Sequence, residues 1–229
     1  MTMKIDLNAI NEKMSSMNSL QRINEACKLF GNNIYALSSA GIDSALMIDY
    51  LSKSDKKVAV IHINSGFLPE ETIQFKKQLE KLYKSKFIEY SPSKETIKDI
   101  NAMRLWEGDY SHYSKLTKLD PLENAIKEKG ISALLSGVRS DQTKNRSTLN
   151  FIDRDSDGVY RVNPFLDWTS DKVNQYIEKN NLPRNPLYFK GFESVGDVHL
   201  TEPGANRSGR KIMECGINVL NGNPIVVDL

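Results

Sequence analysis

The chain has 229 residues, of which 39% are hydrophobic and 26% are charged, and its formal net charge is +2 at pH 7. This length suits one large globular domain with a substantial core, and so small a net charge gives no reason to expect nucleic-acid binding. The N-terminus has no apolar signal core, and no segment approaches the ~18 continuous apolar residues that a membrane span needs. We therefore expect a soluble, cytoplasmic protein that binds neither nucleic acid nor membrane.

Strands and helices alternate along the first part of the chain. Apolar periodicity and terminating Gly residues predict helices that end at Gly31 and Gly130, a helix after Gly41 and another that begins at Pro69. Short β-branched runs predict strands over 33–38, 57–63, 86–90 and 131–137. A polar stretch without an assigned element lies between 91 and 119. This alternation predicts an α/β fold, a mainly parallel sheet with helices on both faces.

The pattern changes in the last third of the chain. Residues 151–162 predict a hairpin with Asp157 and Gly158 in its turn. A helix follows, with Asp167 or Thr169 as its N-cap. The remainder is rich in Gly, Pro and Asn and predicts loops and a flexible C-terminal tail. We divide the chain into a body, 1–205, and a tail, 206–229, that carries Cys215.

Two loops that follow predicted strands carry groups suited to anions. SSAGIDSA, 38–45, joins a strand to a helix with small residues, whose N–H groups at the helix start form a natural phosphate cradle. GVRSDQTKNR, 137–146, concentrates Arg139, Lys144 and Arg146. Each could be an ordinary turn or a solvated loop. We favour anion binding because ligands of open α/β sheets lie beyond the carboxyl ends of the strands.

The two cysteines differ in their surroundings. They are far apart in sequence, which gives no disulfide framework, and the chain shows no zinc-site spacing, so we expect no bound metal. Cys27 lies on the apolar face of a predicted helix and is expected to pack in the core. Cys215 follows Arg207, Arg210 and Lys211, cations that lower a thiol pKa and favour a nucleophile.

These features together resemble the phosphoadenosine phosphosulfate (PAPS) reductase family of the PP-loop, or adenine-nucleotide α-hydrolase-like, superfamily. The resemblance runs from about 33 to 218. The motifs that carry it are SSAGIDSA, HINSGFLPEET, KLDPLENAIKE, GVRSDQTKNR, NPFLDW, NPLYFKGFESVGDVHLTEP and ECGIN.

The resemblance implies a set of site residues. Cys215 matches the nucleophile that attacks the sulfur of PAPS and forms a Cys S-sulfonate, which thioredoxin or glutaredoxin then resolves because no second cysteine lies nearby. It also implies a cytoplasmic homodimer acting in sulfate assimilation. The implied substrate-binding residues are Ser38, Ser39, Ala40, Gly41, Ile42, Asp43, Lys118, Arg139, Arg146, Arg207 and Arg210.

The sequence also departs from this family. Related adenylyl-sulfate (APS) reductases bind a [4Fe-4S] cluster through a Cys-Cys and a Cys-x-x-Cys pair, but the matching regions here, YSHYS and GDVHLT, have no cysteine. The resemblance therefore implies no iron–sulfur cluster, no other bound cofactor, and PAPS rather than APS as substrate. Asn218 replaces the family histidine, and Lys115 is an alternative to Lys118.

Two other functions remain open from the sequence. SAGIDS is close to the Ser-Gly-Gly-x-Asp-Ser loop of ATP pyrophosphatases, so Asp43 could help to hold Mg²⁺ on ATP in an adenylating or thiolating enzyme. The second of these functions is that of a non-catalytic homologue, which binds PAPS without reducing it.

Overall fold

A six-stranded sheet in the order β3-β2-β1-β4-β6-β5 forms the centre of the molecule. The structure is a computed structural model that describes residues 5–205, 207–214, 217 and 225–226. Within this sheet all strand pairs are parallel except β5 with β6, which form the predicted hairpin. The strands are β1 Ile34–Leu37, β2 Val60–Ile63, β3 Phe87–Tyr90, β4 Ala133–Leu135, β5 Ile152–Arg154 and β6 Tyr160–Val162.

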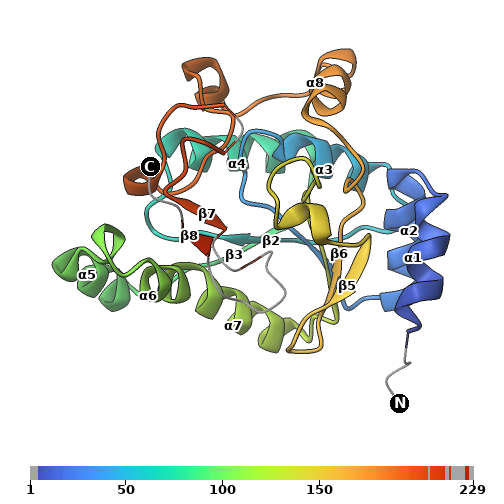
Figure 1. Cartoon of the computed structure of the whole chain (residues 1–229), viewed down its shortest axis with the longest axis horizontal. Coiled ribbons are helices and arrows are strands. Elements are labelled where there is room, and N and C mark those ends of the chain that lie inside the picture. Colours follow the sequence, from blue (N-terminus) through green and yellow to red (C-terminus); the bar gives the residue numbers. More distant parts are fainter. Residues whose placement is uncertain (1–4, 206, 215–216, 218–224, 227–229) are drawn as a thin grey trace.

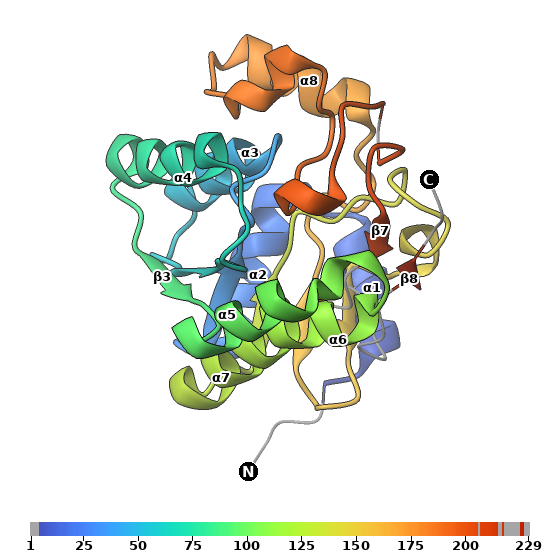
Figure 2. The same ribbon diagram turned by 90° about the vertical axis from the view of Figure 1, so that its left-hand side faces the viewer.

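Helices cover both faces of the sheet, as Figures 1 and 2 show for α3 and α4 on one side and α5, α6 and α7 on the other. The helices are α1 Leu7–Ser15, α2 Ser19–Phe30, α3 Ser44–Ser52, α4 Glu70–Tyr83, α5 Lys94–Met103, α6 Tyr110–Ser114, α7 Asp120–Lys129 and α8 Ser170–Lys179. The predicted α/β architecture with a mainly parallel sheet is therefore confirmed.

Strand β1 shows how the sheet supplies two cores. Ile34 and Ala36 pack with α1, α2 and α3, whereas Tyr35 and Leu37 pack against the cluster that contains α7. Successive side chains of a strand point to opposite faces, so a continuous apolar run is what a doubly covered strand requires.

Helices α1 and α5 occupy regions where the sequence analysis assigned no element. Asp6 caps α1 and Ser93 caps α5 through backbone N–H groups of the first turn. Their apolar signal is weak, because α1 buries only Ile10 and Met14 and α5 buries only Ile100. The caps were visible in the sequence, but too few apolar residues follow them to indicate a helix.

Thr169, one of the two predicted residues, caps α8. Its hydroxyl accepts a hydrogen bond from the Lys172 N–H. Asp167 instead accepts hydrogen bonds from both terminal nitrogens of Arg22, at 2.7 and 3.0 Å. The Arg22 side chain is buried, so this pair ties α2 to the loop before α8.

The described part of the tail packs on the body. Strand β7, Ile212–Glu214, pairs antiparallel with β8, Ile225–Val226. Ile212 is buried against Phe67 and Leu200. The boundary between 205 and 206 and the flexibility of the tail stay predictions. No helix in the described residues is both long and apolar enough to cross a bilayer.

Candidate active site

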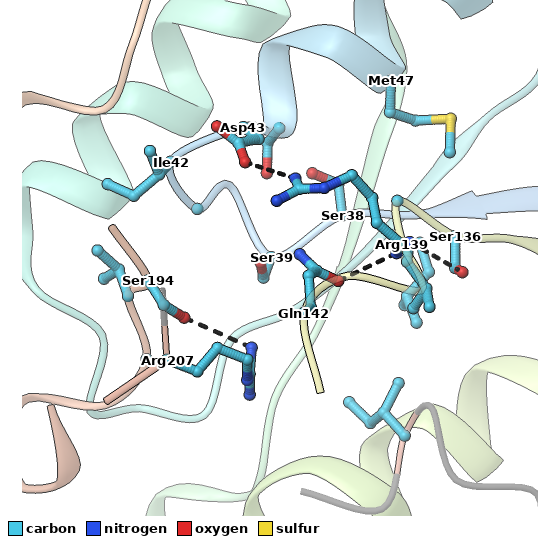
Figure 3. A pocket seen from close by; sticks show the side chains of 18 of the residues that line it. Ser38, Ser39, Ile42, Asp43, Met47, Ser136, Arg139, Gln142, Ser194 and Arg207 are labelled. Atoms are coloured by element: carbon cyan, nitrogen blue, oxygen red, sulfur yellow. Dashed lines mark hydrogen bonds and ion pairs between the residues drawn. The ribbon is translucent and has the colours of Figure 1, made fainter. Parts of the chain in front are cut away.

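The two predicted anion-binding loops follow neighbouring parallel strands, β1 and β4. The chain leaves β1 toward β2 on one side and returns to β4 on the other, so the ends of these strands form a topological switch point. A cavity of about 230 Å³ lies there, with its lining side chains in Figure 3. Of the site residues predicted from the sequence, the lining includes Ser38, Ser39, Gly41, Ile42, Asp43, Lys118, Arg139, Arg146, Arg207 and Arg210.

The loop after β1 lines the cavity and leads into helix α3. The Ser44 and Leu46 N–H groups of the first turn donate to the Gly41 and Asp43 carbonyls at 3.2 and 3.0 Å. Helix α3 begins at Ser44 without a side-chain cap, because Asp43 at the N-cap position makes no such bond. Uncapped N–H groups at a helix start favour an anion. Ala40 has φ 51° and is fully buried in the core, so its side chain does not line the cavity. Its N–H donates to the Ser38 hydroxyl at 3.2 Å.

Two buried polar side chains, His62 and Asn185, form hydrogen bonds to backbone carbonyl oxygens of this loop. Neither had a role predicted from the sequence. The His62 Nδ1 lies 2.9 Å from the Ser38 carbonyl oxygen, which can only accept a hydrogen bond. Burial lowers the pKa of His62, so the ring is neutral at pH 7 and donates from Nδ1. The Asn185 amide donates to the Ala40 carbonyl at 3.1 Å and to Thr72 at 3.0 Å. No sequence signal marked Asn185.

Asp43 is already paired with arginine side chains. Its Oδ2 accepts from Arg139 Nη1 at 2.9 Å, as Figure 3 shows, and its Oδ1 lies 3.6 Å from Arg184 Nη1. Arg139 also donates from Nε to Asp141 at 3.1 Å. The positive charge of Arg139 is therefore largely compensated by two carboxylates before any ligand binds.

Lys118 lies at the cavity, and Lys115 points to solvent. A π-helical turn, Lys115–Leu119, joins α6 to α7, and π-turns within helices often mark functional sites. The Lys118 side chain is buried, with Nζ 2.6 Å from Asp197 Oδ2, while the Lys115 side chain is 61% exposed. The burial and position of Lys118 therefore favour it over Lys115 as the predicted substrate-binding lysine.

Asp197 is the centre of a buried network. Burial alone would raise its pKa, but the charge and hydrogen bond of Lys118 and a hydrogen bond from Ser65 outweigh burial and lower it. Burial and the neighbouring Asp197 raise the pKa of Tyr113. YSHYS and GDVHLT, which are far apart in sequence, thus meet in the fold.

Arg207 and Arg210 line the same cavity from the described part of the tail. Arg210 Nη1 donates to the Val195 carbonyl at 2.9 Å and to the Ser194 hydroxyl at 3.2 Å. Gly196 allows this approach, because a Cβ at that position would lie 2.3 Å from Arg210 Nη2. Arg207 Nη1 lies 3.4 Å from the Ser194 hydroxyl, a contact drawn in Figure 3.

Arg146 is bound to the tail. Its Nε and Nη2 donate to the two carboxylate oxygens of Glu214 at 2.7 and 2.8 Å, and both side chains are buried. The Thr143 hydroxyl donates to the same carboxylate at 2.9 Å. Burial would raise the pKa of Glu214, but the hydrogen bonds and charge of Arg146 prevail and lower it.

Cys215 and Asn218 lie outside the described residues. Their described neighbours are Glu214, bound by Arg146, and Ile217, which lines the cavity. Cys27 is buried in the main core, as predicted, and burial raises its pKa. Within the described ranges no three His, Cys, Asp or Glu side chains are grouped as metal ligands, and the absence of a metal stays a prediction.

Comparisons with known proteins identify the family of this chain. The family model for the phosphoadenosine phosphosulfate reductase domain matches residues 33–203. The chain belongs to this family. A PAPS reductase from Synechococcus is 33% identical over 210 residues, which cover 86% of this chain and 87% of that protein. One from Photobacterium profundum is 30% identical over 225 residues, covering 93% and 88% respectively.

Solved structures show the same fold. A PAPS reductase from Candida auris, a phosphate complex, has a TM-score of 0.78 and 26% identity, covering 88% of this chain and 100% of that one. A Candida glabrata FMN adenylyltransferase in complex with ATP has a TM-score of 0.63 at 17% identity, covering 85% and 64%. This second likeness is one of fold alone.

Proposed function

We propose that this protein reduces PAPS to sulfite and adenosine 3',5'-bisphosphate through an S-sulfonate on Cys215. The observation that carries the proposal is the cavity at the β1–β4 switch point, because Ile217, two residues after Cys215, lines it, and Glu214, directly before Cys215, is bound by the lining residue Arg146. The charged residues that line it, within the described chain, are five cations and three carboxylates. A net positive lining of this kind suits a substrate with several phosphate and sulfate oxygens.

The lining of the cavity suits the two parts of the substrate. Leu46, Met47, Val138 and Phe165 are among its apolar residues and offer a surface for the adenine base. The uncapped start of α3 and the Lys118 ammonium offer donors for phosphate and sulfate oxygens. Arg207 and Arg210 extend the positive charge from the tail.

The chemical step is a thiolate attack on sulfur. A bond forms between Cys215 Sγ and the sulfonate sulfur while the bond from that sulfur to the phosphate oxygen breaks, and the electron pair leaves with adenosine 3',5'-bisphosphate. Cationic groups around the leaving phosphate stabilise the charge that develops on it. Arg207 and Arg210 precede Cys215 closely in the chain and also favour its thiolate.

Release of sulfite needs a second thiol, which we assign to thioredoxin or glutaredoxin. A donor thiolate attacks Cys215 Sγ, sulfite leaves with the electrons of the S–S bond, and the donor's second thiol resolves the mixed disulfide. The donor loses two electrons and Cys215 returns as a thiol. We also propose that the protein is a homodimer and that it acts in the cytoplasm.

We also propose that the reaction proceeds without an iron–sulfur cluster. The regions that correspond to the cluster motifs supply Tyr113, Ser114 and Asp197, all buried, with Asp197 bound to Lys118 and Ser65. Hydroxyl groups and a paired carboxylate are poor ligands for a cluster that requires thiolates. Iron and sulfide analysis of the protein purified without oxygen tests this point, and four irons per chain would overturn it.

The pairing of Asp43 supports the reductase over an ATP pyrophosphatase. The Asp43 carboxylate is paired with Arg139 and lies near Arg184, so two positive charges oppose the binding of Mg²⁺ beside it. An ATP-dependent enzyme of this loop type would need a metal ligand at that position.

The test is sulfite release from PAPS with reduced thioredoxin, with APS in parallel and Cys215→Ser as control. We expect sulfite from PAPS with the wild type and none with the variant. Adenosine 3',5'-bisphosphate binding without sulfite formation would instead indicate a non-catalytic binder. Pyrophosphate formation from ATP and Mg²⁺ would indicate an adenylating enzyme.

A further inference from the structure

We infer that Arg146 and Glu214 form a clamp that fixes β7 at the cavity, so that Arg146 positions the chain entering Cys215 and does not bind the substrate. The inference deepens the proposed function and depends on it only for the role of Cys215. It differs from the substrate-binding role that the family resemblance assigns to Arg146.

Arg146 and Glu214 form a close, buried ion pair. Arg146 meets Glu214 with two parallel hydrogen bonds of 2.7 and 2.8 Å, the arrangement in which a guanidinium and a carboxylate interact most strongly. The Arg146 and Glu214 side chains are 7% and 2% exposed. Because the Nε and Nη2 of this buried arginine both donate to Glu214, few of its N–H groups remain to bind a phosphate.

The loop after β4 adds further hydrogen bonds to both members of this pair. The Arg146 N–H donates to the Thr143 hydroxyl at 3.2 Å, and that hydroxyl donates to Glu214 at 2.9 Å. Gln142 accepts from the third guanidinium nitrogen of Arg146 and from the Arg139 N–H at 3.1 Å. Arg146 is thus held on all sides within the loop and turned toward β7.

The pair lies at the end of β7, directly before Cys215 in the sequence. Glu214 is the last residue of β7 and directly precedes Cys215, while Ile212 of the same strand is buried against Phe67 and Leu200. The strand therefore has an apolar anchor and an ionic anchor two residues apart. Loss of the ion pair would shift the end of β7, the backbone directly before the nucleophile Cys215. A displacement of a reacting group by about 1 Å can lower the reaction rate by up to about 10²-fold.

The test compares Arg146→Gln, Glu214→Gln and their double variant in single-turnover formation of the Cys215 S-sulfonate, with adenosine 3',5'-bisphosphate affinity measured by calorimetry. We expect each single change to slow S-sulfonate formation by about 10²-fold, the double variant to be no slower, and nucleotide affinity to change less than about threefold. Glu214→Asp, which keeps the charge, should recover part of the rate.

Asp167→Asn is the matched control. It also removes a carboxylate that accepts two hydrogen bonds from a buried arginine, Arg22, but it does not line the cavity. We expect it to leave the S-sulfonate rate unchanged. A rate loss of the same size in this control would mean that Arg146 and Glu214 act only through stability, and would overturn the clamp.

Two further outcomes decide against the clamp. Weaker nucleotide binding by tenfold or more in Arg146→Gln but not in Glu214→Gln would make Arg146 a substrate-binding residue. Rate losses that multiply in the double variant would show that the two residues act independently.

A readout without PAPS separates this inference from the proposed function. Trypsin cleavage after Lys211 requires local opening of the segment that carries β7, and iodoacetamide reports access to Cys215, since Cys27 is buried. We expect both rates to rise about tenfold in Arg146→Gln and Glu214→Gln, and not in Asp167→Asn. Unchanged rates in the first two would overturn the clamp even if the protein reduced no PAPS.

Discussion

Basic side chains that look alike in the sequence differ in the fold by the partners they hold. Arg139 is paired with Asp43 and Asp141, and Arg146 with Glu214, whereas Lys118 has Asp197. Each carboxylate consumes part of a positive charge and fixes the direction of the side chain. The capacity of a residue to bind an anion is therefore set by its partner, which a local motif does not reveal.

Gly196→Ala should weaken nucleotide binding. The added Cβ would lie 2.3 Å from Arg210 Nη2, so the guanidinium must move away from the Val195 carbonyl. Loss of one charged hydrogen bond to the ligand lowers affinity by roughly 10- to 100-fold. Calorimetry with adenosine 3',5'-bisphosphate measures the change. Gly108→Ala, with open space around its Cβ, is the control, and equal affinity in both variants would refute the prediction.

Lys118→Met and Lys115→Met should differ in stability. The first leaves Asp197, which is 1% exposed, without its cation, and removing one partner of a buried pair costs roughly 3–5 kcal/mol. The second changes an exposed side chain and should stay within about 0.5 kcal/mol. Urea denaturation measures both. Adding Asp197→Asn to Lys118→Met should recover part of the loss, and no recovery would mean that the pair is not coupled.

At the scale of elements, helix starts serve two different purposes in this fold. Helix α8 is closed by the hydroxyl of Thr169, which satisfies one N–H of its first turn. Helix α3 lacks any side-chain cap, and its first turn faces the cavity. At α3 the Gly41 and Asp43 carbonyls accept from two first-turn N–H groups in place of a side chain, and the dipole of the helix favours an anion at this terminus.

Thr169→Ala should lower the free energy of unfolding by about 1 kcal/mol, the usual effect of removing a hydroxyl N-cap. Urea denaturation monitored by circular dichroism measures this change. Nucleotide affinity should be unaffected, since Thr169 does not line the cavity. A change below about 0.3 kcal/mol would mean that another group caps α8 in solution.

For the molecule as a whole, buried ionisable groups set how stability depends on pH. The pKa of His62 is below its ordinary value of 6.5, chiefly because of burial. As pH falls below 6.5, the unfolded state binds a proton at this residue that the folded state does not, so stability decreases. Asp197 and Glu214 have lowered pKa values, and the stability that they contribute is lost at still lower pH, below their ordinary 3.8 and 4.5.

The free energy of unfolding should therefore fall between pH 7 and pH 5, with a slope of up to about 1.4 kcal/mol per pH unit for one proton. In His62→Gln the slope over this range should be smaller, because the group that titrates is gone. His112→Gln, a change at the surface, should keep the slope of the wild type. Urea denaturation at a series of pH values tests this, and equal slopes in all three proteins would contradict it.

The sequence by itself determined the alternation of strands and helices, the two loops after β1 and β4, and the family. These depend on local periodicity, turn residues and ordered motifs, which are written along the chain. It missed α1 and α5, because their buried apolar residues are too few for a helical pattern.

Only the tertiary structure decided which charges meet. The Arg146 and Glu214 side chains come together across 68 positions of sequence, and those of Lys118 and Asp197 across 79. It likewise buried Ala40 and brought Asn185 to the loop after β1. Pairings of this kind follow from how the elements stack on the sheet and which loops meet at its carboxyl edge. The residues next to a charged side chain in the sequence do not indicate its distant partner. The sequence therefore predicts a cationic site but not the partner of each cation.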